Sequence, residues 1–117
     1  MFKMCSEMAT EQRSRLGGSG VGSPSFRYLF SREELGERAN MISVVTLQPG
    51  ESISEHSHTE NGEIYFVLSG SMTVTDDEEI RELHPGDAEF CADGHRHSAR
   101  NHTDAPASFL AVILPNR

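Results

Sequence analysis

After residue 24, hydrophobic and polar positions alternate over short runs that turn-forming residues separate. Pro-Gly pairs at 49–50 and 85–86 and the acidic segment 76–79 interrupt the runs, so turn signals recur about every 8 to 12 residues. No long segment has the periodicity of a helix. This pattern predicts an all-β fold, either an antiparallel sandwich or a small barrel. The expected strands are 25–30, 41–47, 63–70, 71–75, 80–83, 98–103 and 108–114.

The first 24 residues differ in character from the rest of the chain. They include most of the segment GGSGVGSPS, which has the composition of a flexible connector. We therefore expect a flexible N-terminal arm and connector over residues 1–24 and a single β-barrel domain over residues 25–117. Within that domain, Ser31 and Glu34 have the spacing of a capping box, which predicts one short helical turn near residues 31–36.

The strand EIYFVLSG, residues 63–70, is apolar on both of its faces. Tyr65 and Val67 share one face with Glu63, while Ile64, Phe66 and Leu68 point to the other face. A barrel wall that meets water should be polar outside, so something is expected to cover this strand. A second copy of the chain would do so, which predicts a homodimer. The alternative is that the N-terminal arm folds back over its own sheet.

Charge and composition limit the classes of function. The chain has 117 residues and a formal net charge of −8, and no basic stripe that would bind nucleic acid. No apolar run approaches the roughly 18 residues that a membrane-spanning helix needs. Charged residues interrupt the N-terminal segment, so we expect neither a secretory signal nor a membrane partner, and a cytoplasmic location. The two cysteines, Cys5 and Cys91, are expected to be free thiols in a reducing compartment.

The segment EHSHTENGE, residues 55–63, gathers groups that bind metal ions. His56 and His58 are two positions apart, so on a strand both imidazoles leave the same face. Asn61-Gly62 is a strong turn signal, and a hairpin there would bring Glu63 alongside the two histidines. Such a set suits a divalent transition ion, namely Mn, Fe, Ni, Cu or Zn. A fourth ligand would come from the second histidine pair, His95 and His97. The alternative is a solvated, charged turn.

Two segments resemble the paired sequence motifs of the cupin superfamily, in particular its small one-domain bacterial members of the RmlC-like type. The first keeps every spacing of its motif, and its fixed positions are Gly50, His56, His58, Glu63 and Gly70. The fixed positions of the second are Gly86, Ala92, Gly94, His97 and Asn101. The family usually has proline where Ala92 stands, and proline would stiffen the loop before the last ligand, so the rigidity of this loop is open. The resemblance covers about residues 41–114.

The resemblance implies a jelly roll, which is a double-stranded β-helix of antiparallel strands, and a divalent metal ion held by His56, His58, Glu63 and His97. It also implies that the ion binds a small oxygen-rich metabolite, such as a hydroxy or keto acid, an enediol or a sugar. A metal-dependent enzyme, of dioxygenase, decarboxylase or isomerase type, is the leading hypothesis. A non-catalytic module that binds a sugar or organic acid is the second, and a metal-free barrel is the third. The fold does not choose among them.

Two further residues are candidates for catalysis. Tyr65 shares the face of Glu63 and would direct its hydroxyl to a substrate; the alternative is a core tyrosine bonded to a backbone carbonyl. His95 shares the face of His97 and would act as a general acid or base at the pocket rim. Its alternative is a solvated loop histidine.

Overall fold

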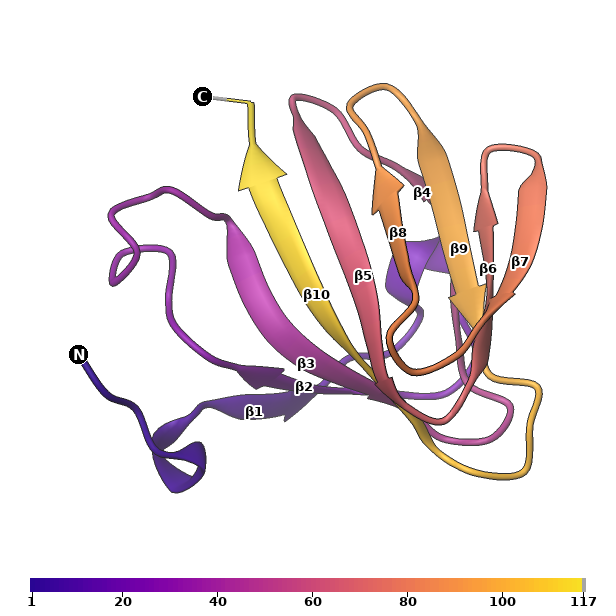
Figure 1. Ribbon diagram of the computed structural model, residues 1–117, viewed down its shortest axis with the longest axis horizontal. Coiled ribbons are helices and arrows are strands. Elements are labelled where there is room, and N and C mark those ends of the chain that lie inside the picture. Colours follow the sequence, from indigo (N-terminus) through magenta and orange to yellow (C-terminus); the bar gives the residue numbers. More distant parts are fainter. Residues whose placement is uncertain (117) are drawn as a thin grey trace.

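Two antiparallel sheets lie face to face and enclose the core (Figure 1). The computed structural model describes residues 1–116. The larger sheet has the strand order β1-β2-β3-β10-β5-β8 and the smaller one β4-β9-β6-β7. The strands are β1 (Thr10–Gln12), β2 (Ser25–Tyr28), β3 (Met41–Leu47), β4 (Ser52–Ser57), β5 (Asn61–Ser69), β6 (Met72–Asp76), β7 (Glu79–Leu83), β8 (Ala88–Cys91), β9 (Arg96–Arg100) and β10 (Ala107–Pro115). The 3₁₀-helices are η1 (Cys5–Glu7) and η2 (Leu16–Gly18).

The prediction of an all-β jelly roll is confirmed. The expected alternation of burial is clear along β5, where Tyr65 and Val67 are each 1% exposed while Phe66 and Leu68 face outward. β10 lies between β3 and β5, and its Phe109 is fully buried against Tyr65, with ring centroids 4.7 Å apart. Truncating an aromatic residue at such a position costs about 3–5 kcal/mol of stability.

Residues 31–36 form the expected single turn, with the reciprocal bonds of a capping box. The backbone N–H of Glu34 donates to Ser31 Oγ at 3.0 Å, and the backbone N–H of Ser31 donates to Glu34 Oε1 at 2.7 Å. The predicted strand 98–103 differs from β9, which starts earlier and ends at Arg100. The chain bends after it because the buried Asn101 side chain donates to the carbonyls of Leu47 and Ala105.

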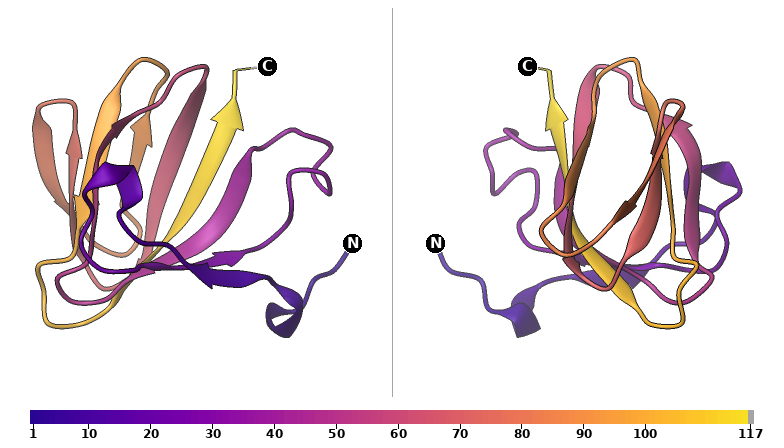
Figure 2. Two further views of the ribbon diagram at one scale, coloured as in Figure 1. Left: turned by 180° about the vertical axis from the view of Figure 1, so that it is seen from behind. Right: turned by 45° about the vertical axis from the view of Figure 1, so that its right-hand side comes forward.

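The N-terminal segment runs beside the barrel and contacts two of its strands (Figure 2). β1 pairs with β2, and the segment after η2 bonds to β4, where Val21 N–H donates to Ser52 Oγ at 2.9 Å. A Cβ added at Gly17 would lie 2.3 Å from the carbonyl oxygen of Ser54, so only glycine permits this approach. The flexibility of residues 1–24 in solution stays a prediction.

The outer face of the larger sheet carries an exposed apolar patch, here called the outer patch, made of Phe66, Leu68 and Phe90. These side chains are 39%, 46% and 56% exposed, and Ile64 pairs with Phe90 in the ladder between β5 and β8. The homodimer predicted from this strand stays a prediction.

Within residues 1–116, none of the helices has the length and apolar character needed to span a membrane.

Candidate metal centre

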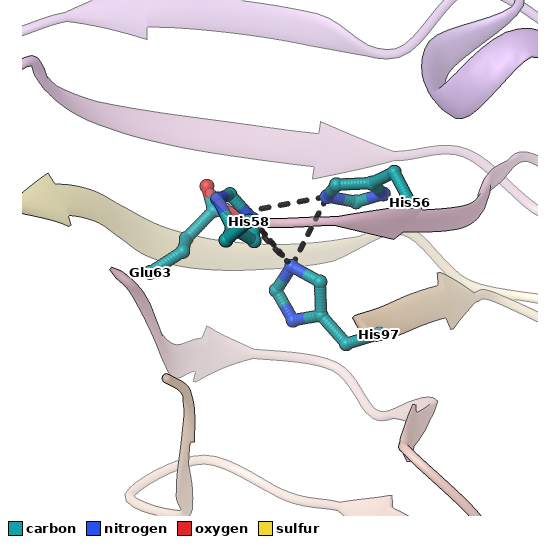
Figure 3. Close-up of side chains that lie close together, drawn as sticks. All are labelled: His56, His58, Glu63 and His97. Carbon is teal, nitrogen blue, oxygen red and sulfur yellow. Dashed lines mark hydrogen bonds and ion pairs between the residues drawn. The ribbon is translucent and has the colours of Figure 1, made fainter. Parts of the chain in front are cut away.

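His56 and His97 face each other across two neighbouring strands. They are paired residues of β4 and β9, and their Nε2 atoms are 3.1 Å apart. His58 follows β4 by one residue and points to the same side as His56, as the two-residue spacing predicts. Its Nε2 lies 3.1 Å from that of His97. Figure 3 shows the three imidazoles converging on one point together with Glu63.

Glu63 reaches the histidines from the opposite sheet. The expected hairpin at Asn61-Gly62 is wrong: these two residues begin β5, and the bend lies before them, at Thr59 and Glu60. Glu60 has a positive φ of 65°, and Gly62 has none. β4 and β5 belong to different sheets, so this connection crosses the barrel instead of folding one strand back on its neighbour.

The spacing of the four donor atoms fits a transition ion. Glu63 Oε1 lies 3.0 Å from Nε2 of both His58 and His97, and 3.7 Å from Nε2 of His56. All four ligating atoms are within 4.8 Å of one another. Ligands bonded at about 2.1 Å to one ion, at right angles to each other, are about 3.0 Å apart. The cluster therefore has the donor types and the dimensions of a site that could hold a divalent metal.

Each imidazole is oriented through its other nitrogen. His56 Nδ1 lies 2.9 Å from the carbonyl oxygen of Ser54, and His58 Nδ1 lies 2.6 Å from Asn61 Oδ1. His97 Nδ1 lies 3.0 Å from both carboxylate oxygens of Glu89. In the neutral imidazoles, acceptors at these positions favour the proton on Nδ1, which leaves the Nε2 lone pair free to bind a metal ion at the centre.

The roles of Asn61 and Glu89 do not follow from the sequence pattern. Asn61-Gly62 has the signature of a turn, and the predicted strands do not include β8, which carries Glu89. The segment AEFC, residues 88–91, has the alternation of a short strand after the Pro-Gly turn, so a signal for β8 was present. Nothing in that alternation indicates that Glu89 would meet a histidine of the other sheet.

Opposing charges stabilise the cluster. Burial acts to raise the pKa of the Glu63 carboxyl, but hydrogen bonding with the three histidines outweighs it and holds that pKa well below its usual range. Burial acts to lower the pKa of His97, but hydrogen bonds to Glu63 and Glu89 reverse this effect and raise the pKa to about 9. The hydrogen bond to Glu63 also raises the pKa of His58. The site therefore attracts positive charge, whether as protons or as a metal ion.

A cavity of about 240 Å³, here called the inner cavity, opens beside the cluster. Its lining includes three of the four predicted ligands, apolar side chains from both sheets, Arg13 and Tyr65. The Tyr65 ring stacks on that of His97 with centroids 4.5 Å apart. Burial raises the pKa of Tyr65 well above its ordinary value, and the nearby charge of Glu63 adds to this. Its hydroxyl is therefore neutral and able to donate a hydrogen bond.

His95 lies away from the inner cavity. Its Nδ1 contacts the Asp77 carboxylate, its side chain is 51% exposed, and it lines a separate groove of about 860 Å³ with Arg96 and several acidic residues. Its catalytic role stays a prediction.

The loop with Ala92 in place of proline is held by two backbone hydrogen bonds. The N–H of His95 donates to the carbonyl of Ala92, and the N–H of Gly94 donates to the carbonyl of His58. Cys91 is buried, and burial raises its pKa to about 12.

Comparisons with known proteins agree with this geometry. The family model described as "Cupin domain" matches residues 43–113. The "Oxalate-binding protein" of Thermotoga maritima is 32% identical over 114 residues, which are 97% of this chain and 93% of that protein. A crystal structure of a predicted oxalate decarboxylase from Thermotoga maritima aligns with a TM-score of 0.92 at 31% identity, covering 98% of this chain and 99% of the other.

A more distant likeness shows how far function varies on this fold. A sugar phosphate isomerase of the cupin superfamily from Silicibacter pomeroyi is 32% identical, with a TM-score of 0.68, over 78% of this chain and 59% of that one. The family model spans well over half of the chain, and it includes all four residues of the candidate metal cluster. The chain belongs to the cupin superfamily.

Proposed function

We propose that this protein holds a divalent transition metal ion through His56, His58, Glu63 and His97, and that it binds a small organic acid, with oxalate the first candidate, at that ion. The observation that carries the proposal is the convergence of four donor atoms, from three strands and the residue after β4, beside a small cavity. Four such ligands leave about two positions of an octahedral ion for a bidentate acid. The ion, when bound, would polarise the oxygens of the acid.

The size of the inner cavity supports a small ligand. Its volume of about 240 Å³ lies below the range of about 300–1,000 Å³ that pockets for drug-sized ligands have. The relatives named for oxalate match nearly the whole chain, so oxalate is the ligand to test first.

Turnover of the bound acid is the second part of the proposal, and Tyr65 supports it. Its neutral hydroxyl belongs to a side chain that lines the inner cavity, next to the ligands Glu63 and His97. There it would donate a hydrogen bond to a bound carboxylate and orient the acid. In a decarboxylation, the carbon–carbon bond of oxalate breaks, carbon dioxide leaves, and a proton joins the remaining carbon to give formate.

The metal is tested by elemental analysis of protein purified without chelators. We expect about one equivalent of Mn, Fe, Ni, Cu or Zn in the wild type and a clear loss in His97→Ala. His84→Ala, which removes an exposed histidine outside the cluster, should retain the metal. Absence of metal from the wild type, even after reconstitution with each ion, would contradict the proposal.

Ligand binding and turnover are separated by two further measurements. Titration calorimetry with oxalate should detect binding to the metal-loaded protein and none to the chelated protein. Incubation with oxalate, followed by assay of formate and carbon dioxide, then decides between an enzyme and a binding module. If product forms, Tyr65→Phe should slow its formation; if none forms over hours while oxalate stays bound, the protein is a binding module.

A further inference from the structure

Within residues 1–116, Arg13 is the one arginine or lysine that lines the inner cavity, and it comes from the N-terminal arm. Arg13 follows β1, and it lines the cavity together with His56, His58 and Glu63. The other lining residues outside the cluster are tyrosine, glycine and apolar residues: Leu16, Gly17, Phe26, Met41, Val45, Ile53, Tyr65 and Ile113.

We propose that Arg13 selects small dicarboxylate anions for this cavity, by binding the carboxylate oxygens that the metal does not hold. This inference rests on the proposed function, because it assumes that an acid binds at the metal. It assigns to residues 1–24 a part in ligand binding, whereas the family motifs lie between Gly50 and Asn101.

The guanidinium of Arg13 packs on Phe26 and has only a long ion pair among residues 1–116. Its central carbon lies 5.0 Å from the ring centroid of Phe26, a cation–π contact that leaves its donors available. Among residues 1–116 its one ion pair is long: Arg13 Nε lies 4.0 Å from Glu11 Oε1, and that carboxylate also accepts the hydroxyl of Tyr28. The Arg13 side chain is 45% exposed, so a ligand entering the cavity can reach it.

The arm fixes Arg13 relative to the metal ligands. The Arg13 backbone N–H donates to the carbonyl of Pro24 at 3.0 Å, which extends the pairing of β1 with β2. Beyond it, Ser54 Oγ donates to the Leu16 carbonyl at 3.0 Å and accepts the backbone N–H of Ser19 at the same distance. Ser54 stands two positions before His56 on β4, so the arm and the first ligand share one strand as their support.

The charges in the cavity match a dianion. A divalent ion with three neutral imidazoles and one carboxylate carries one net positive charge, and Arg13 adds a second because arginine stays protonated. A dicarboxylate would neutralise both charges, whereas a monocarboxylate would leave one without a partner. The walls of the inner cavity are mainly apolar, so within residues 1–116 few other polar groups line it that could pair with the second carboxylate. The planar fork of the guanidinium also fits a carboxylate with two parallel hydrogen bonds.

The test is titration calorimetry of oxalate and of acetate against protein that carries its metal ion, with the metal content measured for each variant. In Arg13→Gln we expect oxalate to bind about 10- to 100-fold more weakly, acetate to bind nearly as before, and the metal content to stay the same. Arg13→Lys should restore part of the oxalate affinity. Arg27→Gln removes an equal charge from an exposed side chain of β2 and should change neither affinity.

The outcomes separate this inference from the proposed function. Equal oxalate affinity in the wild type and in Arg13→Gln would overturn the role of Arg13 and leave the proposed function standing. Equal losses for oxalate and acetate would also overturn it, because they would indicate a distorted cavity instead of a lost carboxylate contact. A metal-loaded wild type that binds no organic acid would overturn both.

Discussion

Both carboxylate oxygens of Glu89 lie 3.0 Å from Nδ1 of His97, although the two residues belong to different sheets. His97 is buried, and the Glu89 side chain is 9% exposed, so little water competes for this hydrogen bond. The contact fixes the ring of His97 with Nε2 toward the other ligands. In the proposed metal site, Glu89 would therefore be a positioning residue that acts through His97.

Removing this support should weaken metal binding. We expect Glu89→Leu to lower the metal affinity about 10- to 100-fold, because the Nδ1 proton of His97 loses its acceptor. Glu89→Gln keeps an oxygen acceptor for His97 and should therefore lower the metal affinity less than Glu89→Leu does. Competition with a chelator of known affinity measures both effects, and Glu79→Leu, at an exposed glutamate of β7, is the matched control. Unchanged affinity in Glu89→Leu would show that packing alone orients His97.

The metal-free protein should lose stability as the pH rises above neutral. The pKa of His97 is raised from its ordinary value of 6.5 to about 9 in the folded chain, so the charged imidazole favours folding. This contribution is fully present below a pH of about 6.5 and is lost as the pH rises to about 9. Thermal unfolding in chelator between pH 6 and 10 should show this decline in the wild type and a weaker one in His97→Gln. Parallel curves for the two proteins would refute the expectation.

Two neighbouring glycines allow the docking of the arm to be tested. Gly17 and Gly18 both have positive φ, so alanine is strained at either position. Only at Gly17 would a new Cβ meet the backbone of Ser54, whereas at Gly18 nothing lies within 4 Å. We therefore expect Gly17→Ala to increase hydrogen exchange in residues 10–24 far more than Gly18→Ala does. Equal exchange in the two variants, and rapid exchange in the wild type, would indicate an arm that is already detached.

The outer patch of Phe66, Leu68 and Phe90 leads us to expect a dimer. Light scattering at micromolar concentration should give twice the monomer mass for the wild type and the monomer mass for Leu68→Glu, because a charge buried between two sheets has no partner. Ile80→Glu changes an exposed residue of the other sheet, 63% accessible, and should remain dimeric. A wild-type protein with the mass of a monomer would contradict the prediction.

Local patterns in the sequence are sufficient to predict most of the strands and which face of a strand a side chain takes. Strands such as β3, β5 and β10 follow from alternation, since successive side chains of an extended chain point to opposite faces. The same parity places His56 and His58 together, and it places Tyr65 on the buried face with Glu63. The reciprocal bonds of Ser31 and Glu34 are equally local, because a capping box closes within four residues.

Contacts between residues of the two sheets, and between the arm and the barrel, depend on the tertiary structure alone. The turn signal at Asn61-Gly62 predicts that a local hairpin brings Glu63 to the histidines, whereas the chain crosses to the other sheet and Glu63 reaches them from β5. Glu89 and Arg13 had no predicted role, because their positions depend on how the sheets close and where the arm lies. His95 and His97 share a sequence pattern, but His97 joins the buried cluster whereas His95 lines a separate groove. Spacing along a strand fixes which face a side chain takes, and only packing of distant segments fixes what it meets there.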